Sequence, residues 1–275
     1  MQETKRNVTK ENDLQRIKEL RLMDDDFFSE ALDGKTEAVE YILNTILERD
    51  DIKVKSTKAQ VEYKSATKRS IKLDIQAEDV HGRLMDIEIQ RSDRGSGVRR
   101  ARFHSSMIDR SLLSKGDDFE ELVDTYVIFI TEKDKFGMGI PLYHIERKIS
   151  EMDNALFGDG AHILYVNGEY RNLEHPVGSL MHDFNCKDAK DMVNPLLAEE
   201  VRYLKETEGG LSQMSRILEE MRNEVAEKAK AEGNHEKAVN TALKMIAKKY
   251  EAEEIAEITG LSLEEVRKLE ENQKG

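Results

Sequence analysis

The sequence of 275 residues contains one cysteine, Cys186, and has no long apolar segment. A single cysteine excludes an intrachain disulfide and a zinc site built from several cysteines. No stretch approaches the roughly 18 consecutive apolar residues of a membrane span, and the N-terminus lacks the apolar core of a signal peptide. We therefore expect a cytoplasmic protein without membrane contact.

Positive charge is also scarce, because 43 Lys and Arg face 56 Asp and Glu and the net charge is −13. Phosphate affinity comes from cations, so this balance argues against a general polyanion binder, and any contact with DNA must be local. Glycine-rich phosphate loops, G-x-S-x-G elbows and kinase motifs are absent, which argues against nucleotide-driven chemistry. The histidines, His104, His144 and His162 among them, show no spacing typical of metal ligands, and we expect them to be structural or exposed.

Residues 71–78 and 84–90 each alternate apolar and polar side chains, as half-buried strands do. The five residues between them include a glycine and have the length of a hairpin loop. If the turn centres on His81, Asp74 lies opposite Glu88, and Lys72 lies opposite Gln90 on the same face. Opposed Cβ atoms are roughly 4.5–5.5 Å apart, so the two carboxylates require a proton or a cation between them. A hard divalent metal is the natural occupant.

A second interpretation fits the same two strands. Antiparallel sheets carry acidic residues on exposed polar faces, and a register shift of two would separate Asp74 from Glu88. The alternation alone therefore leaves a metal site and a solvated polar face both open.

The order of residues over a longer part of the chain favours the metal site. Asp74 followed by Glu88-Ile89-Gln90 resembles the D…(D/E)-x-K signature of PD-(D/E)XK nucleases, with Gln90 in the lysine position. With residues 23–28, 41–47 and 99–103, the set from about Leu22 to about Cys186 resembles the recombination-promoting nuclease family, often labelled PD-(D/E)XK transposases. Glutamine in the third position is common in that family.

This resemblance implies an α/β fold, with a restriction-endonuclease-like mixed sheet flanked by helices, and metal-dependent DNA endonuclease activity. It implies that Asp74, Glu88 and the backbone carbonyl of Ile89 bind Mg²⁺, or Mn²⁺, and that Gln90 orients the attacking water. Asp25, which fits the family's D-x-x-F pattern, is a further candidate acid.

Two questions about this site stay open. We consider Lys72 a candidate for the positive charge that a lysine in the position of Gln90 would supply. The competing function is a nuclease fold without chemistry that serves as a DNA-binding or assembly module.

A basic segment follows the acidic strands. Residues 91–110 contain six arginines, among them Arg94, and two aspartates, one of which is Asp93. We predict a helix from about Val98 on which Arg99, Arg102 and Arg110 share the exposed face. These three and Arg91 are the candidate DNA-binding residues, although a solvated helix face fits the same pattern.

The scaffold around these segments shows further regular patterns. Residues 36–49 have helical spacing, and residues 124–131 form a nearly continuous apolar run that predicts a central strand covered on both faces. Residues 142–149 and 162–166 predict further strands, and Asn167-Gly168 predicts a hairpin turn leading into residues 169–170.

We place the end of the nuclease-like domain at residue 186 and predict a helical region over residues 187–275. Breaks at Glu208-Gly209-Gly210 and at Gly233-Asn234 are expected to bound helices over 211–231 and 236–250. Residues 252–266 predict a helix-turn-helix with Gly260 in the turn. Its acidic second helix favours a packing or homo-oligomerisation unit over a DNA reader.

Overall fold

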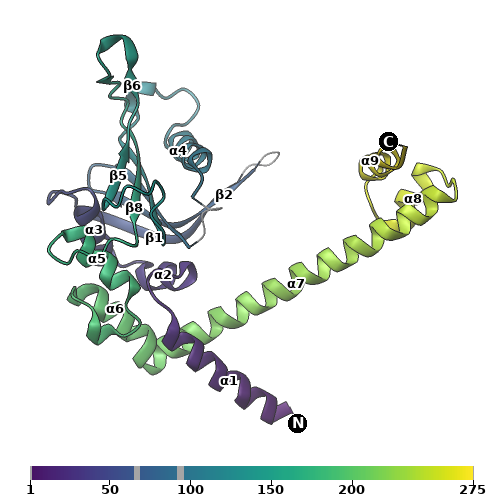
Figure 1. The fold of residues 1–275 in the computed structure, drawn as a ribbon, viewed down its shortest axis with the longest axis horizontal. Helices are drawn as coiled ribbons and strands as arrows, with labels where there is room; N and C mark the ends of the chain where they lie inside the picture. Colours follow the sequence, from purple (N-terminus) through teal and green to yellow (C-terminus); the bar gives the residue numbers. More distant parts are fainter. Residues whose placement is uncertain (1, 65–68, 92–95, 275) are drawn as a thin grey trace. The chain divides into compact units, whose positions relative to one another are not determined.

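The computed structural model describes residues 2–64, 69–91 and 96–274, so Asp93 and Arg94 lie outside the described residues. The chain divides into two compact units, Met1–Gln213 and Met214–Gly275. The first unit contains the strands and α1 to α6, and the second contains most of α7 with α8 and α9 (Figure 1). The helices are α1 (Gln2–Glu19), α2 (Asp25–Leu32), α3 (Thr36–Ile46), α4 (Val98–Leu112), α5 (Pro176–Asn185), α6 (Pro195–Glu206), α7 (Glu208–Ala247), α8 (Ala252–Thr259) and α9 (Leu263–Lys274).

The first unit is built on a mixed six-stranded sheet in the order β1-β2-β3-β4-β8-β5. Its strands are β1 (Val54–Tyr63), β2 (Ile71–Asp79), β3 (Leu84–Gln90), β4 (Thr125–Thr131), β5 (Leu142–Ile145) and β8 (Ala161–Asn167). The pairs β1/β2, β2/β3 and β5/β8 are antiparallel, whereas β3/β4 and β4/β8 are parallel. A separate two-stranded ribbon joins β6 (Lys148–Ile149) to β7 (Ala155–Leu156).

Helices cover the sheet, and α4 contacts β4 and β8 while α2 and α3 contact β1. Beneath α4, Ala101 and Ile108 pack with Val127, Phe129 and Tyr165 in one buried cluster. Because side chains alternate along a strand, the even-numbered residues of β4 and β8 face the other side of the sheet. Every residue of β4 is buried, which confirms the predicted central strand.

The predicted fold class is confirmed by this mixed sheet flanked by helices. The helix from Val98 and the strands over β2, β3 and β8 are also confirmed. Strand β1 and helix α1 were not predicted. The turn at Asn167-Gly168 forms, with Tyr170 N donating to Asn167 O, but the chain then enters α5, so the predicted hairpin is wrong.

The first predicted helix break is displaced, because the chain breaks at Thr207, between α6 and α7, and Glu208-Gly209-Gly210 already belong to α7. The second predicted break, at Gly233-Asn234, is wrong, because α7 continues through both residues. Gly209 and Gly210 lie in its first turn, where a Cβ on Gly210 would collide with the backbone oxygen of Tyr203 in α6. This glycine therefore permits a close approach of two helices. Gly233 is accommodated inside the helix at a cost of about 1 kcal/mol relative to alanine.

Helix α6 contacts α2 and α3 and belongs to the first unit, so the division at Gln213 lies beyond the predicted domain boundary at residue 186. In the second unit, Ile255 of α8 and Val266 of α9 are buried in a common apolar cluster. Gly260 ends α8 with a φ of 72°, a conformation that glycine adopts readily. Ser262 and Glu265 form a reciprocal capping box at α9, which confirms the predicted helix-turn-helix geometry. None of the described helices has the length and apolarity needed to cross a membrane.

Candidate nuclease site

The β2/β3 hairpin has the predicted register, since Ile75 pairs with Ile87 and Glu78 with Leu84. The pairing ends at Ile75 and Ile87, and Asp74 and Glu88 are the next residues of the two strands, joined by a hydrogen bond from Asp74 N to the Glu88 carboxylate. Both carboxylates are inside the protein, with relative exposures of 7% for Asp74 and 0% for Glu88. The predicted acidic pair is therefore brought together and removed from water.

Each carboxylate is held by a backbone amide of the neighbouring strand. Glu88 Oε1 accepts from Asp74 N at 3.1 Å, and Asp74 Oδ2 accepts from Ile89 N at 2.9 Å. Such crossed hydrogen bonds fix both side chains, because a carboxylate that accepts from rigid backbone loses its rotamer freedom. Glu88 Oε1 and Asp74 Oδ2 are therefore each occupied by a backbone hydrogen bond.

The backbone on the other side of Asp74 is distorted. Gln60, opposite Asp74 in the β1/β2 register, has a φ of 56°, which is uncommon for a residue with a side chain. Its side-chain nitrogen Nε2 donates to Ser29 Oγ at 2.7 Å, and that hydroxyl donates to Asp74 O at 3.3 Å. The distorted backbone at Gln60 and the hydroxyl of Ser29 together hold the backbone of Asp74 in place.

Helix α4 adds a chain of polar contacts to the acidic strand. Arg100 Nη2 lies 2.7 Å from Glu88 Oε2, and Arg100 Nε donates to His104 Nε2 at 3.1 Å. Since arginine only donates, Nε2 is the acceptor nitrogen, and Nδ1 carries the proton that it donates to Asp86 Oδ2 at 3.0 Å. Burial lowers the pKa of His104, in agreement with this neutral ring.

Asp86 is a third buried acid, two residues before Glu88 on the same face of β3. Its Oδ1 atom is buried and has no hydrogen-bond partner in the described part of the chain. One ligand atom from each of Asp86, Glu88 and His104 lies within 4.8 Å of the others. A buried carboxylate oxygen without a partner is costly, so Asp86 Oδ1 fits a bound cation, whereas both ring nitrogens of His104 are already hydrogen-bonded.

The acids strongly perturb one another. Burial, followed by the charges of Glu88 and Asp25, raises the pKa of Asp74 to about 9. Burial, followed by the charge of Asp86, raises the pKa of Glu88 to about 8. The pKa of Asp86 is also raised well above its usual value by burial. Near pH 7 these buried acids therefore either hold protons or have their charge neutralised by a bound cation.

Asp25, the first residue of α2, interacts with Asp74, and its role as a further site acid stays a prediction. A hydrogen bond from its side chain contributes to the raised pKa of Asp74. Helix α2 also contacts β2 and β3, the strands that carry the two acids. Asp25 itself is exposed, which leaves it accessible to a substrate.

Gln90 ends β3 beside Thr131 of β4 and is partly buried. The backbone of Ile89 reaches Asp74 through its amide, and the predicted role of its carbonyl remains a prediction. Lys72 is exposed and lines an open pocket of about 650 Å³ with Arg99 and Arg100. In the described structure, the arginine that contacts Glu88 is Arg100, on α4.

The predicted basic stripe is exposed, with Arg99, Arg102 and Arg110 all on the solvent side of α4. Arg91 has a different environment, since its Nη1 lies 2.6 Å from Asp24 and its Nε lies 3.6 Å from Glu132. Glu132 also pairs with Arg21 at 2.9 Å. Arg91 therefore joins the start of α2 to the ends of β3 and β4, next to Asp25.

Sequence reasoning missed Asp86, Arg100 and His104 as members of the site. Alternation along β3 places Asp86 on the face of Glu88, and the i, i+4 spacing of Arg100 and His104 places these two on one side of α4. Both signals were present in the sequence. What it could not show is that α4 packs on the sheet so that Arg100 and His104 reach the acids of β3.

Comparison with known proteins agrees with this geometry. No curated protein and no solved structure matches the chain. Residues 26–257 match the family described as PD-(D/E)XK nuclease family transposase, a match that includes β2, β3 and α4. Such a family implies a nuclease-type function with DNA as the substrate. The chain belongs to the PD-(D/E)XK nuclease family transposases.

Proposed function

We propose that the protein is a metal-dependent DNA endonuclease that hydrolyses phosphodiester bonds. The observation that carries this proposal is the pair of buried acids, Asp74 and Glu88, each anchored by an amide of the facing strand. Buried carboxylates at such close range are stable only when protons or cations compensate their charge. A divalent cation would neutralise the charge of the two carboxylates and would also promote hydrolysis of a phosphodiester bond.

Asp74, Glu88 and the carbonyl of Ile89 would hold Mg²⁺ or Mn²⁺, which prefer oxygen ligands. The unpartnered oxygen of Asp86 lies in the same buried group and supports the fit. When bound, the ion would supply charge neutralisation at the scissile phosphate and a bound water of lowered pKa.

The protein's own groups would do the remaining work. The Gln90 amide can both donate and accept, so it can orient the attacking water at the end of β3. Asp25 adds a carboxylate at the open side of the site. The charge of Arg100 lowers the pKa of Glu88 and so favours its metal-binding carboxylate form, and Lys72 would supply further positive charge at the substrate.

The DNA backbone would be held by Arg99, Arg102 and Arg110 on the exposed face of α4. This helix follows the strand of Glu88, so one strand of DNA can contact the arginines and place a phosphate at the acids. Arg91 would contribute only if a phosphate displaces it from Asp24, since that ion pair already uses its guanidinium.

Calorimetry with Mg²⁺ and Mn²⁺ tests this proposal before any assay of cleavage. Asp74→Asn and Glu88→Gln should each abolish measurable binding in a folded protein. Glu78→Gln is a matched control on the same strand, because Glu78 pairs with Lys55 at the surface, where ion pairs contribute little. Equal metal affinity in all three variants would contradict the proposal.

A further inference from the structure

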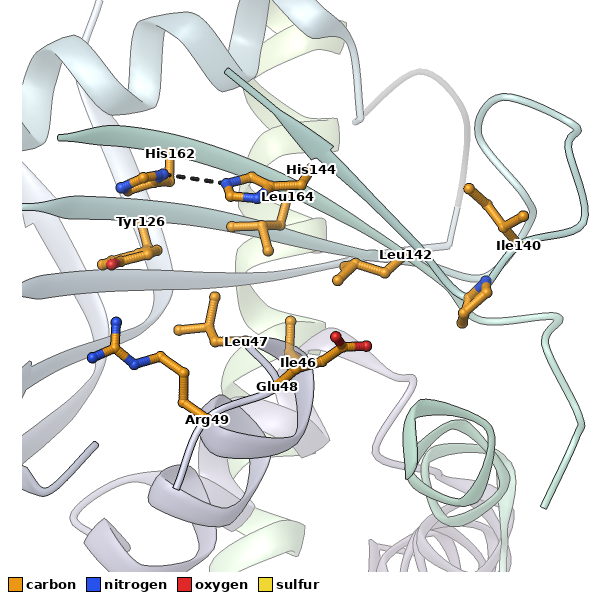
Figure 2. Close-up of a pocket in the computed structure, with 11 residues that line it drawn as sticks. Ile46, Leu47, Glu48, Arg49, Tyr126, Ile140, Leu142, His144, His162 and Leu164 are labelled. Carbon is orange, nitrogen blue, oxygen red and sulfur yellow. Dashed lines mark hydrogen bonds between the residues drawn. The ribbon is translucent and has the colours of Figure 1, made fainter. Parts of the chain in front are cut away.

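A second cluster of potential ligands lies at the far edge of the sheet, on β5 and β8. The β5/β8 register pairs Ile145 with Ile163, so the next pair outward is Glu146 opposite His162. His144 lies two residues before Glu146 and therefore on the same face. Figure 2 shows the two imidazole rings directed toward each other, with Tyr126 beside His162.

The separations of the three ligand atoms suit a small metal ion. His144 Nε2 and His162 Nδ1 are 3.2 Å apart, and Glu146 Oε1 lies 3.9 Å from each of them. A point equidistant from these three atoms is about 2.1 Å from each, whereas zinc takes imidazole nitrogen at about 2.0–2.1 Å and carboxylate oxygen at about 2.0–2.2 Å. The described structure already has this spacing.

The chemistry of the set differs from that of the acid site. Two imidazoles and one carboxylate are ligands for a transition metal with open coordination positions, whereas Mg²⁺ prefers oxygen alone. The His162 ring is held by stacking on Tyr126, with ring centres 4.6 Å apart and planes inclined by 14°. Burial lowers the pKa of His162, so the neutral ring that binds metals is favoured.

The cluster is also accessible. His144 and His162 line an open cavity of about 480 Å³ whose other walls include Tyr126, Arg49 and Leu164 (Figure 2). Glu146 is exposed at the surface. An ion and one small ligand can therefore reach the rings from solvent.

This site is separate from the acids. Glu88 pairs with Phe129, whose ring packs beneath α4, whereas His162 pairs with Tyr126, which alternates to the opposite face of the sheet. We propose that His144, Glu146 and His162 form a binding site for a divalent transition metal, with zinc the best fit, on the sheet face opposite the acid cluster. Such an ion would also fasten the edge strand β5 to β8.

The test uses full-length protein without a histidine tag, in an Asp74→Asn/Glu88→Gln background that disables the acid site. Titration with Zn²⁺ and with Co²⁺ should give one equivalent bound, and the cobalt complex should show visible absorption bands typical of nitrogen and oxygen ligands. His144→Gln and His162→Gln should each weaken binding at least tenfold. His81→Gln, at an exposed hairpin residue, is the matched control and should leave binding unchanged.

Circular dichroism reports whether each variant folds. If loss of the Tyr126 stack unfolds the His162 variant, Glu146→Gln replaces it, because this exposed side chain makes no contribution to the core. Absence of binding in the folded background protein would overturn the proposal. Unchanged affinity in both His144→Gln and Glu146→Gln would overturn it equally.

Discussion

The guanidinium of Arg100 lies 2.7 Å from a carboxylate oxygen of Glu88, a side chain with no exposed surface. Helix α4 thus places the positive charge of Arg100 beside Glu88, which lies twelve residues earlier in the chain. This contact couples the charge state of the site to the position of α4.

The first prediction concerns that contact. At about pH 9, where Glu88 is ionised, Arg100→Gln should destabilise the metal-free protein by about 1–3 kcal/mol, since it removes the guanidinium that lies 2.7 Å from this buried carboxylate. Added Mg²⁺ should restore more stability in this variant than in wild type. Urea unfolding in EDTA and in Mg²⁺ measures both effects. Arg99→Gln removes an adjacent exposed arginine and serves as control; equal losses in the two variants would argue against a specific role for Arg100.

A second prediction concerns pH. In the folded, metal-free protein the pKa of Asp74 is raised to about 9 and that of Glu88 to about 8, so the folded state holds protons that the unfolded state has released. Stability should therefore fall as pH rises from about 5, just above the ordinary pKa values of these carboxyls, to about 9, with a slope of up to about 1.4 kcal/mol per pH unit for each proton.

Asp74→Asn should flatten this dependence, because it removes one titrating group and lowers the pKa of the other. Unfolding in EDTA at a series of pH values checks the difference between the two proteins. A wild-type stability that rises with pH over this range, or a variant with an identical slope, would contradict the raised pKa values.

The third prediction concerns the arginine stripe. Reversal of Arg99 and Arg102 to glutamate should weaken DNA binding and reduce the salt slope by about 2, one for each lost phosphate contact. Reversal of Arg267 and Lys268 is the control, since both already pair with glutamates of the C-terminal helices. If the C-terminal reversal alone reduces affinity, the DNA contact belongs to the helix-turn-helix and the stripe is a solvated face.

The fourth prediction concerns the lysine that the family pattern places at Gln90. If Lys72 supplies the equivalent charge, Lys72→Met should lower the cleavage rate at saturating metal, and adding Gln90→Lys should restore part of it. Rates from single-turnover cleavage separate this effect from DNA affinity. Full activity of Lys72→Met would assign the essential positive charge to the metal and Arg100 alone.

The sequence predicted what depends on short-range pattern. The alternation of β2 and β3 and the centre of their turn determine that Asp74 faces Glu88, and the burial pattern of α4 follows from its helical spacing. Asp86 and His104 could not be assigned in this way, because their roles depend on how α4 packs over the sheet. His144 and His162 were expected to be structural or exposed, because only the pairing of β5 with β8 brings them together.

The errors in the helical region have a similar cause. Glycine and asparagine lower helix propensity by no more than about 1 kcal/mol each, and a helix of 40 residues tolerates such a cost. At Gly210 the reason for glycine is the close approach of Tyr203 rather than an interruption of the helix. Local propensity could not distinguish these two reasons.

Plasmid nicking tests the central claim most directly. Supercoiled DNA incubated with wild-type protein should be nicked in Mg²⁺ or Mn²⁺ and left intact in EDTA. Asp74→Asn and Glu88→Gln should lower the rate on the order of 100-fold or more, whereas Glu78→Gln, purified in the same way, should retain the wild-type rate. Nicking that persists in folded Asp74→Asn protein, or no metal-dependent nicking by wild type, would contradict the assignment of these acids as a nuclease centre.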